Sequence, residues 1–515
     1  MHKPIENKIY KNIRYCFSAV FFMQRRNVSM SMIQVEHLSF SYDSQQEMLF
    51  DDVSFSIDTD WKLGLVGRNG RGKTTFLSLL MKKYPYQGKI RSSVSFDYFP
   101  FVVVNQEQWT IDVVRSIYPL VEDWQIQREL SYLQVEDDVL WREFSTLSQG
   151  EQTKVLLAVL FLKPGNFLLI DEPTNHLDAK ARVVLMHYLQ RKKGFILVSH
   201  DRKVLDGCVD HILAINRQTI EVQAGNYSSW FSRFETQQEK ELQEDKRLRK
   251  DIRRLKSSAL RTSMWSDKIE ASKIGAADKG FVGHKSAKMM QRSKNIAKRQ
   301  QAAIEQKEGL LKNAEEMESL QMKPLNHPAS VLISLDDVSP LYDGKVIGKP
   351  QSFLIEKGQR IFLDGKNGCG KSSLLKLLVD PKREHRGKIQ WASNLIVSYV
   401  SQDASFLQGT LSQYAKQYEI DETLYRTLLR KMGFERWQFD QKIQSYSDGQ
   451  KKKVMLARSL CEKAHIYIWD EPLNFIDIYT RMQIEKMILS SQATMLIVEH
   501  DIAFRENVAT KVVVL

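Results

Sequence analysis

Two glycine-rich segments carry the residue types that bind phosphate. They read GRNGRGKTT at 67–75 and GKNGCGKSS at 365–373, and each follows a short apolar run. Glycines let consecutive backbone N–H groups close around phosphate oxygens at the start of a helix, and the lysine supplies positive charge. Each segment therefore predicts a nucleotide site. The predicted nucleotide-binding residues of these loops are Gly67, Asn69, Gly70, Gly72, Lys73, Thr74, Thr75, Gly365, Asn367, Gly368, Gly370, Lys371, Ser372 and Ser373.

The lysine and the hydroxyl after it have separate expected roles in each loop. We expect Lys73 and Lys371 to reach the β- and γ-phosphates of ATP. Thr74 and Ser372 are expected to bind Mg²⁺. A single loop of this pattern has a real false-positive rate. Two such loops, each followed by the same downstream motifs, make ATP and Mg²⁺ the expected cofactors.

Acidic side chains follow later apolar runs in both halves. Asp171 and Asp470 each end such a run, where a carboxylate can hold Mg²⁺ through water. The next residues, Glu172 and Glu471, fit a general base that orients the attacking water. The chemistry that these pairs predict is hydrolysis of ATP.

The same motifs recur in one order at a nearly constant spacing. Each motif has a second copy 298 to 300 residues further along the chain. The repeated motifs are the phosphate loops, LSQGEQ at 147–152 with YSDGQK at 446–451, the Asp-Glu pairs and two later histidines. A lone histidine at a strand end is more often structural than functional. The repeat reverses that reading, so His200 and His500 are expected to face the γ-phosphate.

The repeat predicts two α/β nucleotide-binding domains at 30–229 and 326–515, joined by residues 230–325. Apolar runs such as KLGLVG and GFILVSH are typical of buried parallel strands. Residues 1–29 contain the apolar run CFSAVFFM, for which a signal peptide is the alternative interpretation. Two arginines follow this run, however, and the small-residue cleavage site of a signal peptide does not. We expect residues 1–29 to be an extension outside the fold.

The composition favours a reduced, cytoplasmic protein. No stretch approaches the ~18 apolar residues that span a bilayer, so we expect no membrane partner. The four cysteines, Cys16, Cys208, Cys369 and Cys461, lie far apart without metal-ligand spacing.

Positive charge is concentrated between the two repeats. Residues 240–299 contain 18 Lys or Arg and 7 Asp or Glu, so they carry +11 of the net charge of +13. Such a concentration favours a polyanionic partner. The alternative is a solvated helical face.

The segment between the repeats predicts two long helices. Residues 233–262 lack glycine and proline, which predicts a helix of about 45 Å. Apolar residues form a stripe on it, and apolar residues spaced by sevens follow in 285–320, so the two helices can pair as an antiparallel hairpin. The stripe residues are Leu248, Ile252, Leu255 and Ala259, and the returning ones are Met290, Ala297, Ile304 and Leu311. The alternative is that these helices pack on a domain.

Residues 264–284 are the expected tip of this hairpin. Aromatic and basic side chains on a glycine-containing loop suit stacking and phosphate contact with structured RNA. The candidate contact residues are Trp265, Lys273, Lys279, Phe281, His284 and Lys285. The alternative for each aromatic residue is that it caps the hairpin's small core.

A Ser-x-Gly-Gln-like element lies 23 residues before each predicted Mg²⁺-binding aspartate, Asp171 and Asp470. It resembles the signature of ATP-binding-cassette (ABC) ATPases. This resemblance implies two ABC domains that pair head to tail within one chain. Ser447 and Gly449 would then complete the first ATP site. Ser148 and Gly150 would complete the second.

The resemblance also implies an aromatic residue that stacks on adenine, for which Tyr42 and Tyr342 have the right spacing; the alternative is core packing. The sequence departs from the family in two places. Phe101 stands where the second half has Gln402, the residue expected to touch Mg²⁺. Asp448 replaces a glycine of the second signature. The two sites are therefore expected to differ.

The motifs EPTNHLD at 172–178 and EPLNFID at 471–477 resemble the ABC-F subfamily over residues 32–515. The runs WKLGLVGRNGRGKTT, YSSWF and YSDGQKKKVMLARSL are most similar to the Lsa/Vga-type antibiotic-resistance proteins of that subfamily. The resemblance implies a monomer that enters the ribosomal E site with ATP bound. Its hairpin would reach past the P-site tRNA and contact large-subunit 23S rRNA. It would displace lincosamide, pleuromutilin or streptogramin A drugs, and hydrolysis would release it.

Other functions stay open. A housekeeping ABC-F translation factor that relieves stalled ribosomes has the same motifs. The ATPase subunit of a transporter can also carry two cassettes, but such subunits lack a long basic hairpin between them. A DNA-repair or chromosome ATPase would need a longer coiled coil or zinc-binding cysteines.

Overall fold

The computed structural model describes residues 32–42, 48–175, 177–216, 219–271, 295–296, 298–299, 320–342 and 344–515. By compactness the chain divides into two units. One unit joins Met1–Tyr227 with Ser319–Leu515, and the other is Ser228–Glu318. The first unit contains two α/β domains, here called the first cassette (32–227) and the second cassette (320–515).

The first cassette is built on a mainly parallel sheet of strand order β5-β6-β7-β3-β8-β9 and a smaller antiparallel sheet, β2-β1-β4. Strands β5 to β8 run parallel, and β9 joins β8 antiparallel. The strands are Met32–Phe40 (β1), Phe50–Asp58 (β2), Lys62–Val66 (β3), Gln87–Ser92 (β4), Ser95–Phe99 (β5), Asn166–Asp171 (β6), Phe195–Val198 (β7), His211–Ile215 (β8) and Ile220–Ala224 (β9). The helices are Lys73–Leu80 (α2), Thr110–Ile117 (α3), Asp123–Tyr132 (α4), Gln149–Leu162 (α5), Ala179–Gln190 (α6) and Arg202–Cys208 (α7), with 3₁₀ turns at Asp137–Trp141 (η1) and Phe144–Thr146 (η2).

The second cassette repeats this design. Its parallel sheet has the order β15-β16-β17-β13-β18, and its antiparallel sheet pairs β10 with β11, β12 and β14. The strands are Val331–Tyr342 (β10), Lys345–Val346 (β11), Gln351–Glu356 (β12), Arg360–Asp364 (β13), His385–Trp391 (β14), Val397–Val400 (β15), Ile466–Asp470 (β16), Met495–Val498 (β17) and Lys511–Val514 (β18). The helices are Lys371–Val379 (α10), Leu411–Gln417 (α11), Glu422–Lys431 (α12), Asp448–Cys461 (α13), Ile478–Ser491 (α14) and Ile502–Val508 (α15), with 3₁₀ turns at Arg436–Asp440 (η3) and Ile443–Ser445 (η4).

The central parallel strands are buried along their whole length. Every residue of FILV in β7, IYIWD in β16 and MLIV in β17 is buried. Parallel strands that are covered on both faces read as continuous apolar runs, as the sequence predicted. The prediction of two tandem α/β domains is therefore confirmed.

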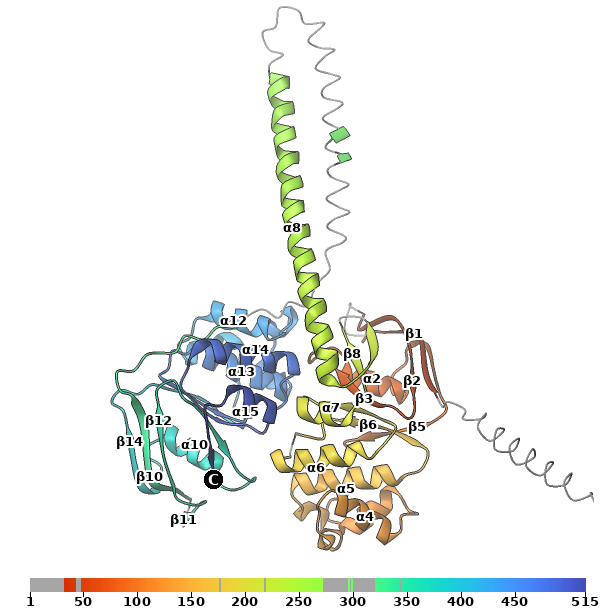
Figure 1. Cartoon of the computed structure of the whole chain (residues 1–515), viewed down its shortest axis with the longest axis vertical. Coiled ribbons are helices and arrows are strands. Elements are labelled where there is room, and N and C mark those ends of the chain that lie inside the picture. Colours follow the sequence, from red (N-terminus) through yellow and green to blue (C-terminus); the bar gives the residue numbers. More distant parts are fainter. Residues whose placement is uncertain are drawn as a thin grey trace, which may run out of the picture. The chain divides into compact units, whose positions relative to one another are not determined.

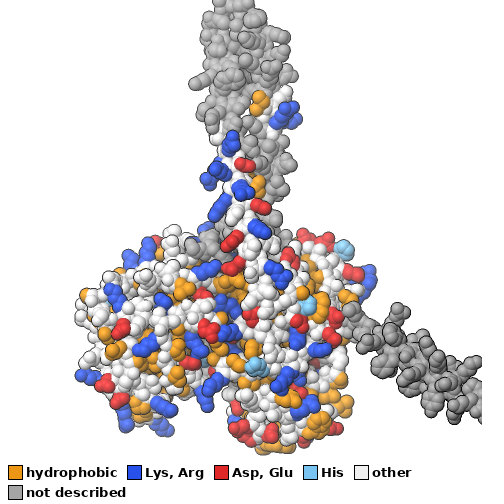
Figure 2. Space-filling view, viewed as in Figure 1, with side chains coloured by type: hydrophobic (Ala, Val, Ile, Leu, Met, Phe, Trp, Pro, Cys, Tyr) orange, Lys and Arg blue, Asp and Glu red, His pale blue; other side chains and the backbone are white. Residues whose placement is uncertain are grey.

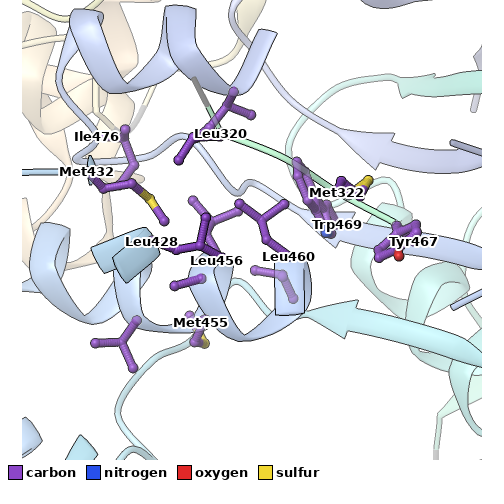
Figure 3. Close-up of a cluster of buried hydrophobic side chains, with 14 of the residues drawn as sticks. Leu320, Met322, Leu428, Met432, Met455, Leu456, Leu460, Tyr467, Trp469 and Ile476 are labelled. Atoms are coloured by element: carbon purple, nitrogen blue, oxygen red, sulfur yellow. The ribbon is translucent and has the colours of Figure 1, made fainter. Parts of the chain in front are cut away.

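A large core lies between β16 and the helices of the second cassette. Leu320 and Met322, which precede β10, pack into it together with Leu456 and Leu460 of α13 and Trp469 of β16 (Figure 3). Burying a leucine or methionine side chain stabilises a fold by about 1.5–3 kcal/mol. The chain that follows the linker is thus anchored in the second cassette.

The linker begins as one continuous helix, α8, from Tyr227 to Ala271 (Figure 1). It extends beyond the predicted range of 233–262, so residue 264, the expected start of the tip, is helical. Of the predicted stripe, Ile252 is buried and Leu248 is half-buried. The side chains of Leu255 and Ala259, and nearly all of the expected returning helix, lie outside the described residues. So do residues 1–29.

We find no helix within the described ranges that is both long and apolar enough to cross a membrane.

Candidate nucleotide sites

Each phosphate loop connects a buried strand to a helix. The first lies between β3 and α2, and the second between β13 and α10. Gly72 has a φ of +87°, and a Cβ there would lie 2.8 Å from a Leu49 methyl group. Gly370 has a φ of +100° at the equivalent place. Only glycine adopts this conformation freely, which explains the glycine before each lysine.

The lysine of each loop is buried and turned back onto the loop. Lys73 Nζ donates to Gly67 O at 2.8 Å and to Asn69 Oδ1 at 3.2 Å. Lys371 Nζ donates to Gly365 O at 2.7 Å. Burial lowers the pKa of Lys73, although nearby carboxylates oppose the shift. An ammonium group held in this way faces the space that the loop encloses, as a phosphate-binding lysine must.

The predicted Mg²⁺ ligands of the first site lie together. Thr74 Oγ1 donates to Asp171 Oδ2 at 2.8 Å, and the Tyr98 hydroxyl donates to the same oxygen at 3.1 Å. Burial raises the pKa of Asp171, against these hydrogen bonds. The arrangement supplies the oxygen ligands that Mg²⁺ prefers.

The carboxylate of the second site, Asp470, is fully buried and lacks a hydrogen bond of normal geometry among the described residues. Burial raises its pKa to about 6. A buried, unpaired carboxylate is costly unless a cation or donor satisfies it. This observation fits Mg²⁺ held by Asp470 and Ser372.

The two candidate bases share a strained backbone. Glu172 has a φ of +51° and Glu471 a φ of +47°, which is uncommon for residues other than glycine. His200 Nε2 lies 3.3 Å from Glu172 Oε1, and His500 Nε2 lies 3.6 Å from Glu471 Oε1. The structure therefore places each predicted histidine beside its predicted glutamate.

The surroundings of the two glutamates differ. Glu471 Oε2 accepts hydrogen bonds from Gln402 Nε2 at 2.8 Å and Asn474 Nδ2 at 2.6 Å. The Glu172 carboxylate accepts no hydrogen bond of normal geometry from the described residues. Phe101, at the position of Gln402, is exposed. Gln402 was predicted to touch Mg²⁺; its amide here bonds the candidate base, and the metal role stays a prediction.

The pKa values of the two glutamates shift in opposite directions. Burial and the charge of Asp171 raise the pKa of Glu172 to about 8. Burial also acts to raise the pKa of Glu471, but His500 and Lys452 outweigh it and hold this pKa below its ordinary value. The equivalent of Lys452 in the first cassette is Thr153, by the alignment of α5 with α13.

Lys452 joins two loops of the second site. Its buried Nζ donates to Ser401 O at 3.0 Å and to Glu471 O at 3.2 Å. It therefore ties the Gln402 loop to the strand end that carries Glu471. The sequence analysis did not identify this role of Lys452, which is one of three consecutive lysines after the second signature.

The signature serines begin helices. Ser148 caps α5 and Ser447 caps α13, each through a capping box. Asp448 lies in the first turn of α13, where negative charge suits a helix N-terminus. This explains why an aspartate is accepted in place of glycine.

The second signature lies against the first phosphate loop. Asn69 Nδ2 donates to Phe475 O at 2.8 Å, and a Cβ on Gly449 would lie 3.4 Å from Asn69 Nδ2. This is the contact expected of head-to-tail pairing. The completion of the second site by Ser148 and Gly150 stays a prediction.

The two predicted adenine-stacking tyrosines differ in their surroundings. The Tyr42 hydroxyl lies 2.8 Å from Thr75 Oγ1, and its ring packs edge-on against Phe40. Tyr342 is exposed. The Tyr42 contact brings an aromatic ring to the phosphate loop, and stacking on adenine stays a prediction for both.

Two buried ion pairs were missed by the sequence reading. Arg182 Nη1 donates to Asp201 Oδ2 at 3.1 Å, and Arg481 Nη1 donates to Asp501 Oδ2 at 2.9 Å. Each aspartate directly follows the predicted histidine of its cassette. The repeat spacing, which places both arginines at equivalent positions, was the signal that would have found them.

The predicted tip residues lie largely outside the described chain. The backbone of Trp265 belongs to α8, but its side chain is not described. Lys273, Lys279, Phe281, His284 and Lys285 all fall in the undescribed segment.

Comparison with known proteins agrees with this geometry. The family model described as ABC transporter matches residues 50–175 and 349–474. The ribosome protection protein VmlR of Bacillus subtilis is 28% identical over 91% of this chain and 84% of its own length. The ATP-binding protein Uup of Buchnera aphidicola is 26% identical over 94% of this chain and 80% of its own length.

Solved structures share the fold. The archaeal ribosome recycling factor aABCE1, in complex with the ribosomal stalk protein aP1, superposes with a TM-score of 0.62 at 19% identity. The alignment covers 93% of this chain and 87% of that one. At this identity the likeness supports the tandem-cassette architecture alone.

Proposed function

Since this chain is a tandem ABC ATPase that resembles the ABC-F subfamily, we propose that it acts in the cytoplasm by binding the ribosome. It protects the peptidyl-transferase centre from lincosamide, pleuromutilin or streptogramin A antibiotics. The observation that carries the proposal is similarity to a ribosome protection protein over 91% of the chain. That length includes the linker as well as both ATPase domains.

The chemistry of the switch belongs to the paired cassettes. Lys73 and Lys371 hold the phosphates of ATP, and Glu172 and Glu471 orient water for hydrolysis. Mg²⁺, held by Thr74 with Asp171 and by Ser372 with Asp470, neutralises phosphate charge when bound. Asn69 of the first phosphate loop bonds Phe475 of the second cassette. Nucleotide bound at this loop therefore influences how the two cassettes pair.

The described part of the linker suits a polyanionic partner. Residues 246–256 of α8 carry seven Lys or Arg and one aspartate. Most of these basic side chains are exposed, and Figure 2 shows blue side chains along this part of α8. We propose that the linker approaches 23S rRNA and the P-site tRNA through the E site. Of the predicted tip, 264–284, residues 272–284 follow the described end of α8.

Ribosome binding is tested with the Glu172→Gln/Glu471→Gln variant. We expect this variant to bind ATP without hydrolysing it and to sediment with ribosomes through a sucrose cushion. The wild-type protein, which hydrolyses its ATP, should sediment less. The matched control adds Lys73→Ala and Lys371→Ala, which remove the phosphate contacts. A trapped variant that stays free of ribosomes at low salt would contradict the proposal.

Drug protection is tested by expression in a sensitive bacterium. We expect raised inhibitory concentrations for the three drug classes. The inhibitory concentration of a drug that acts on the small ribosomal subunit should not change. Deleting 272–284, just beyond the described end of α8, should abolish protection and leave ATP hydrolysis intact. Full resistance after the deletion would show that this segment is not the acting element. Ribosome binding without any protection would favour a translation factor.

A further inference from the structure

The helical part of the first cassette presents large aromatic side chains to solvent. Trp109, Trp124 and Trp141 are 53%, 55% and 54% exposed, and Leu120 is 80% exposed. Exposed tryptophan is uncommon on a surface without a partner, and interfaces are enriched in it. We call these four residues, with the carboxylates of 107–143 that flank them, the acidic aromatic surface.

Backbone and side-chain contacts join these residues into one region. Thr110 N donates to Arg142 O at 2.9 Å, so Trp109 at the start of α3 lies beside the end of η1, which carries Trp141. Arg115 of α3 bonds Asp123 at 2.8 Å, and Trp124 follows in α4. Helix α3 is about 12 Å long at its eight residues. The segments that carry these aromatic side chains thus lie close enough together for one small interface.

The platform beneath this surface is held firmly. Glu129 of α4 is buried and accepts a hydrogen bond from the Tyr188 hydroxyl of α6 at 2.7 Å. Lys192 also pairs with the Glu129 carboxylate. A buried charge network of this kind fixes α4 against the rest of the cassette.

The charge of this region is opposite to that of the chain. Besides the buried Glu129, residues 101–147 contain eight exposed or half-buried Asp or Glu and three Arg, whereas the whole chain carries a net charge of +13. Figure 2 shows hydrophobic and acidic side chains together at the end of the first cassette where Figure 1 labels α4. An acidic surface repels RNA and anionic lipid.

The second cassette supplies an internal comparison. Its equivalent residues, 402–446, contain six acidic and six basic residues, and one exposed tryptophan, Trp437. Both regions support the same fold. The acidic charge and the additional tryptophans of the first cassette are therefore not required by the shared fold, which favours a role in binding.

One ring of this surface, that of Trp124, already accepts a cation. The Arg128 guanidinium lies 5.3 Å from the ring centroid of Trp124, within the range of a cation–π contact. Lysine and arginine side chains of a partner can bind the exposed rings in the same way and pair with the carboxylates around them.

We propose that the acidic aromatic surface docks a lysine- and arginine-rich protein surface. The inference rests on the proposed function, so the partner is a basic protein of the ribosome, and ribosomal RNA is excluded at this place. On this proposal, the basic helix α8 contacts RNA, and the acidic aromatic surface of the first cassette contacts protein.

The sign of a charge effect separates the two partners. In the Glu172→Gln/Glu471→Gln background, Asp137→Asn/Asp138→Asn removes two exposed negative charges from η1 without a large change in shape. We expect ribosome affinity, measured by sedimentation at increasing protein concentration with ATP, to fall several-fold. Tighter binding would overturn the inference, because removing negative charge favours an RNA partner.

The aromatic contribution is tested by Trp109→Ala/Trp124→Ala/Trp141→Ala in the same background. We expect ribosome affinity to fall about tenfold or more, since interface tryptophans are common hot spots. Trp437→Ala in the second cassette is the matched control and should leave affinity within about twofold. ATP binding by each variant checks that the cassettes are folded. An unchanged affinity in the triple variant would overturn the inference.

A photo-crosslinking residue at position 109 or 124 identifies the partner class directly. We expect crosslinks to protein in the ATP-trapped ribosome complex, and crosslinks to rRNA would overturn the inference while leaving the proposed function standing. A trapped variant that does not sediment at all would instead overturn the proposed function, and the inference with it.

Discussion

Near neutral pH, Glu471→Gln is expected to lower ATP turnover by about 100-fold or more, whereas Glu172→Gln is expected to leave most of the turnover in place. The reason is the protonation state of the two bases. His500 and Lys452 outweigh burial and hold the pKa of Glu471 below its ordinary value, so this carboxylate is charged. Burial and Asp171 raise the pKa of Glu172 to about 8, so most of it is protonated.

The pH dependence of each single variant follows from the same difference. In Glu471→Gln, the remaining hydrolysis depends on Glu172 and should rise with pH up to about 8, because only the deprotonated form accepts a proton. In Glu172→Gln, hydrolysis depends on Glu471 and should stay flat between about pH 7 and about pH 9, above the pKa of about 6 of Asp470. Steady-state phosphate release across this range measures both.

Two outcomes decide this prediction. Equal losses of turnover and equal pH profiles in the two variants would show that the cassettes hydrolyse ATP as one unit. The control is Lys452→Thr in the Glu172→Gln background, which gives the second cassette the residue that the first has at Thr153. We expect it to move the second site towards the pH dependence of the first, because the Glu471 carboxylate loses a nearby positive charge.

Asp501→Ala is expected to destabilise the second cassette by about 3–5 kcal/mol, because it leaves the Arg481 guanidinium buried without its acid. Arg481 also donates from Nε to Ile476 O and from Nη2 to Leu473 O, each at 2.9 Å. Asp501 in turn caps α15 through Phe504 N. The pair therefore joins the loop after Glu471 to the helix after His500.

Urea unfolding followed by tryptophan fluorescence measures the loss. Asp201→Ala makes the equivalent change in the first cassette and should weaken that cassette to a similar extent. Arg115→Ala removes the exposed Arg115–Asp123 pair and is expected to cost less than about 1 kcal/mol. A loss for Asp501→Ala as small as that of the exposed pair would contradict the prediction.

The contribution of Asp501 also depends on pH. Burial acts to raise its pKa, but Arg481 and Arg202 outweigh burial and hold the pKa below its ordinary value in the folded state. The stabilisation is therefore present above the unfolded pKa of about 4 and is lost as pH falls through the folded value. In acid, the difference in stability between wild type and Asp501→Ala should shrink.

The sequence by itself determined the parts whose chemistry is local. A phosphate loop requires glycine in a left-handed conformation, a lysine and a hydroxyl at fixed spacing, so Gly72, Lys73 and Thr74 were readable without a structure. The continuous apolar runs of β3 and β7 identified buried parallel strands, because a strand covered on both faces has apolar residues at every position. The repeat then assigned the second copy of each motif.

Only the tertiary structure decided how distant residues meet. The helix α8 continues past residue 264 because no local signal stops it before the glycines. The bond from Asn69 to Phe475 joins segments that no spacing rule connects. The opposite pKa shifts of Glu172 and Glu471 depend on burial and on neighbours such as Lys452, and burial is a property of the packed fold. The sequence thus named the candidate groups for ATP hydrolysis and predicted that the two sites differ, and packing determined how the surroundings of Glu172 and Glu471 differ.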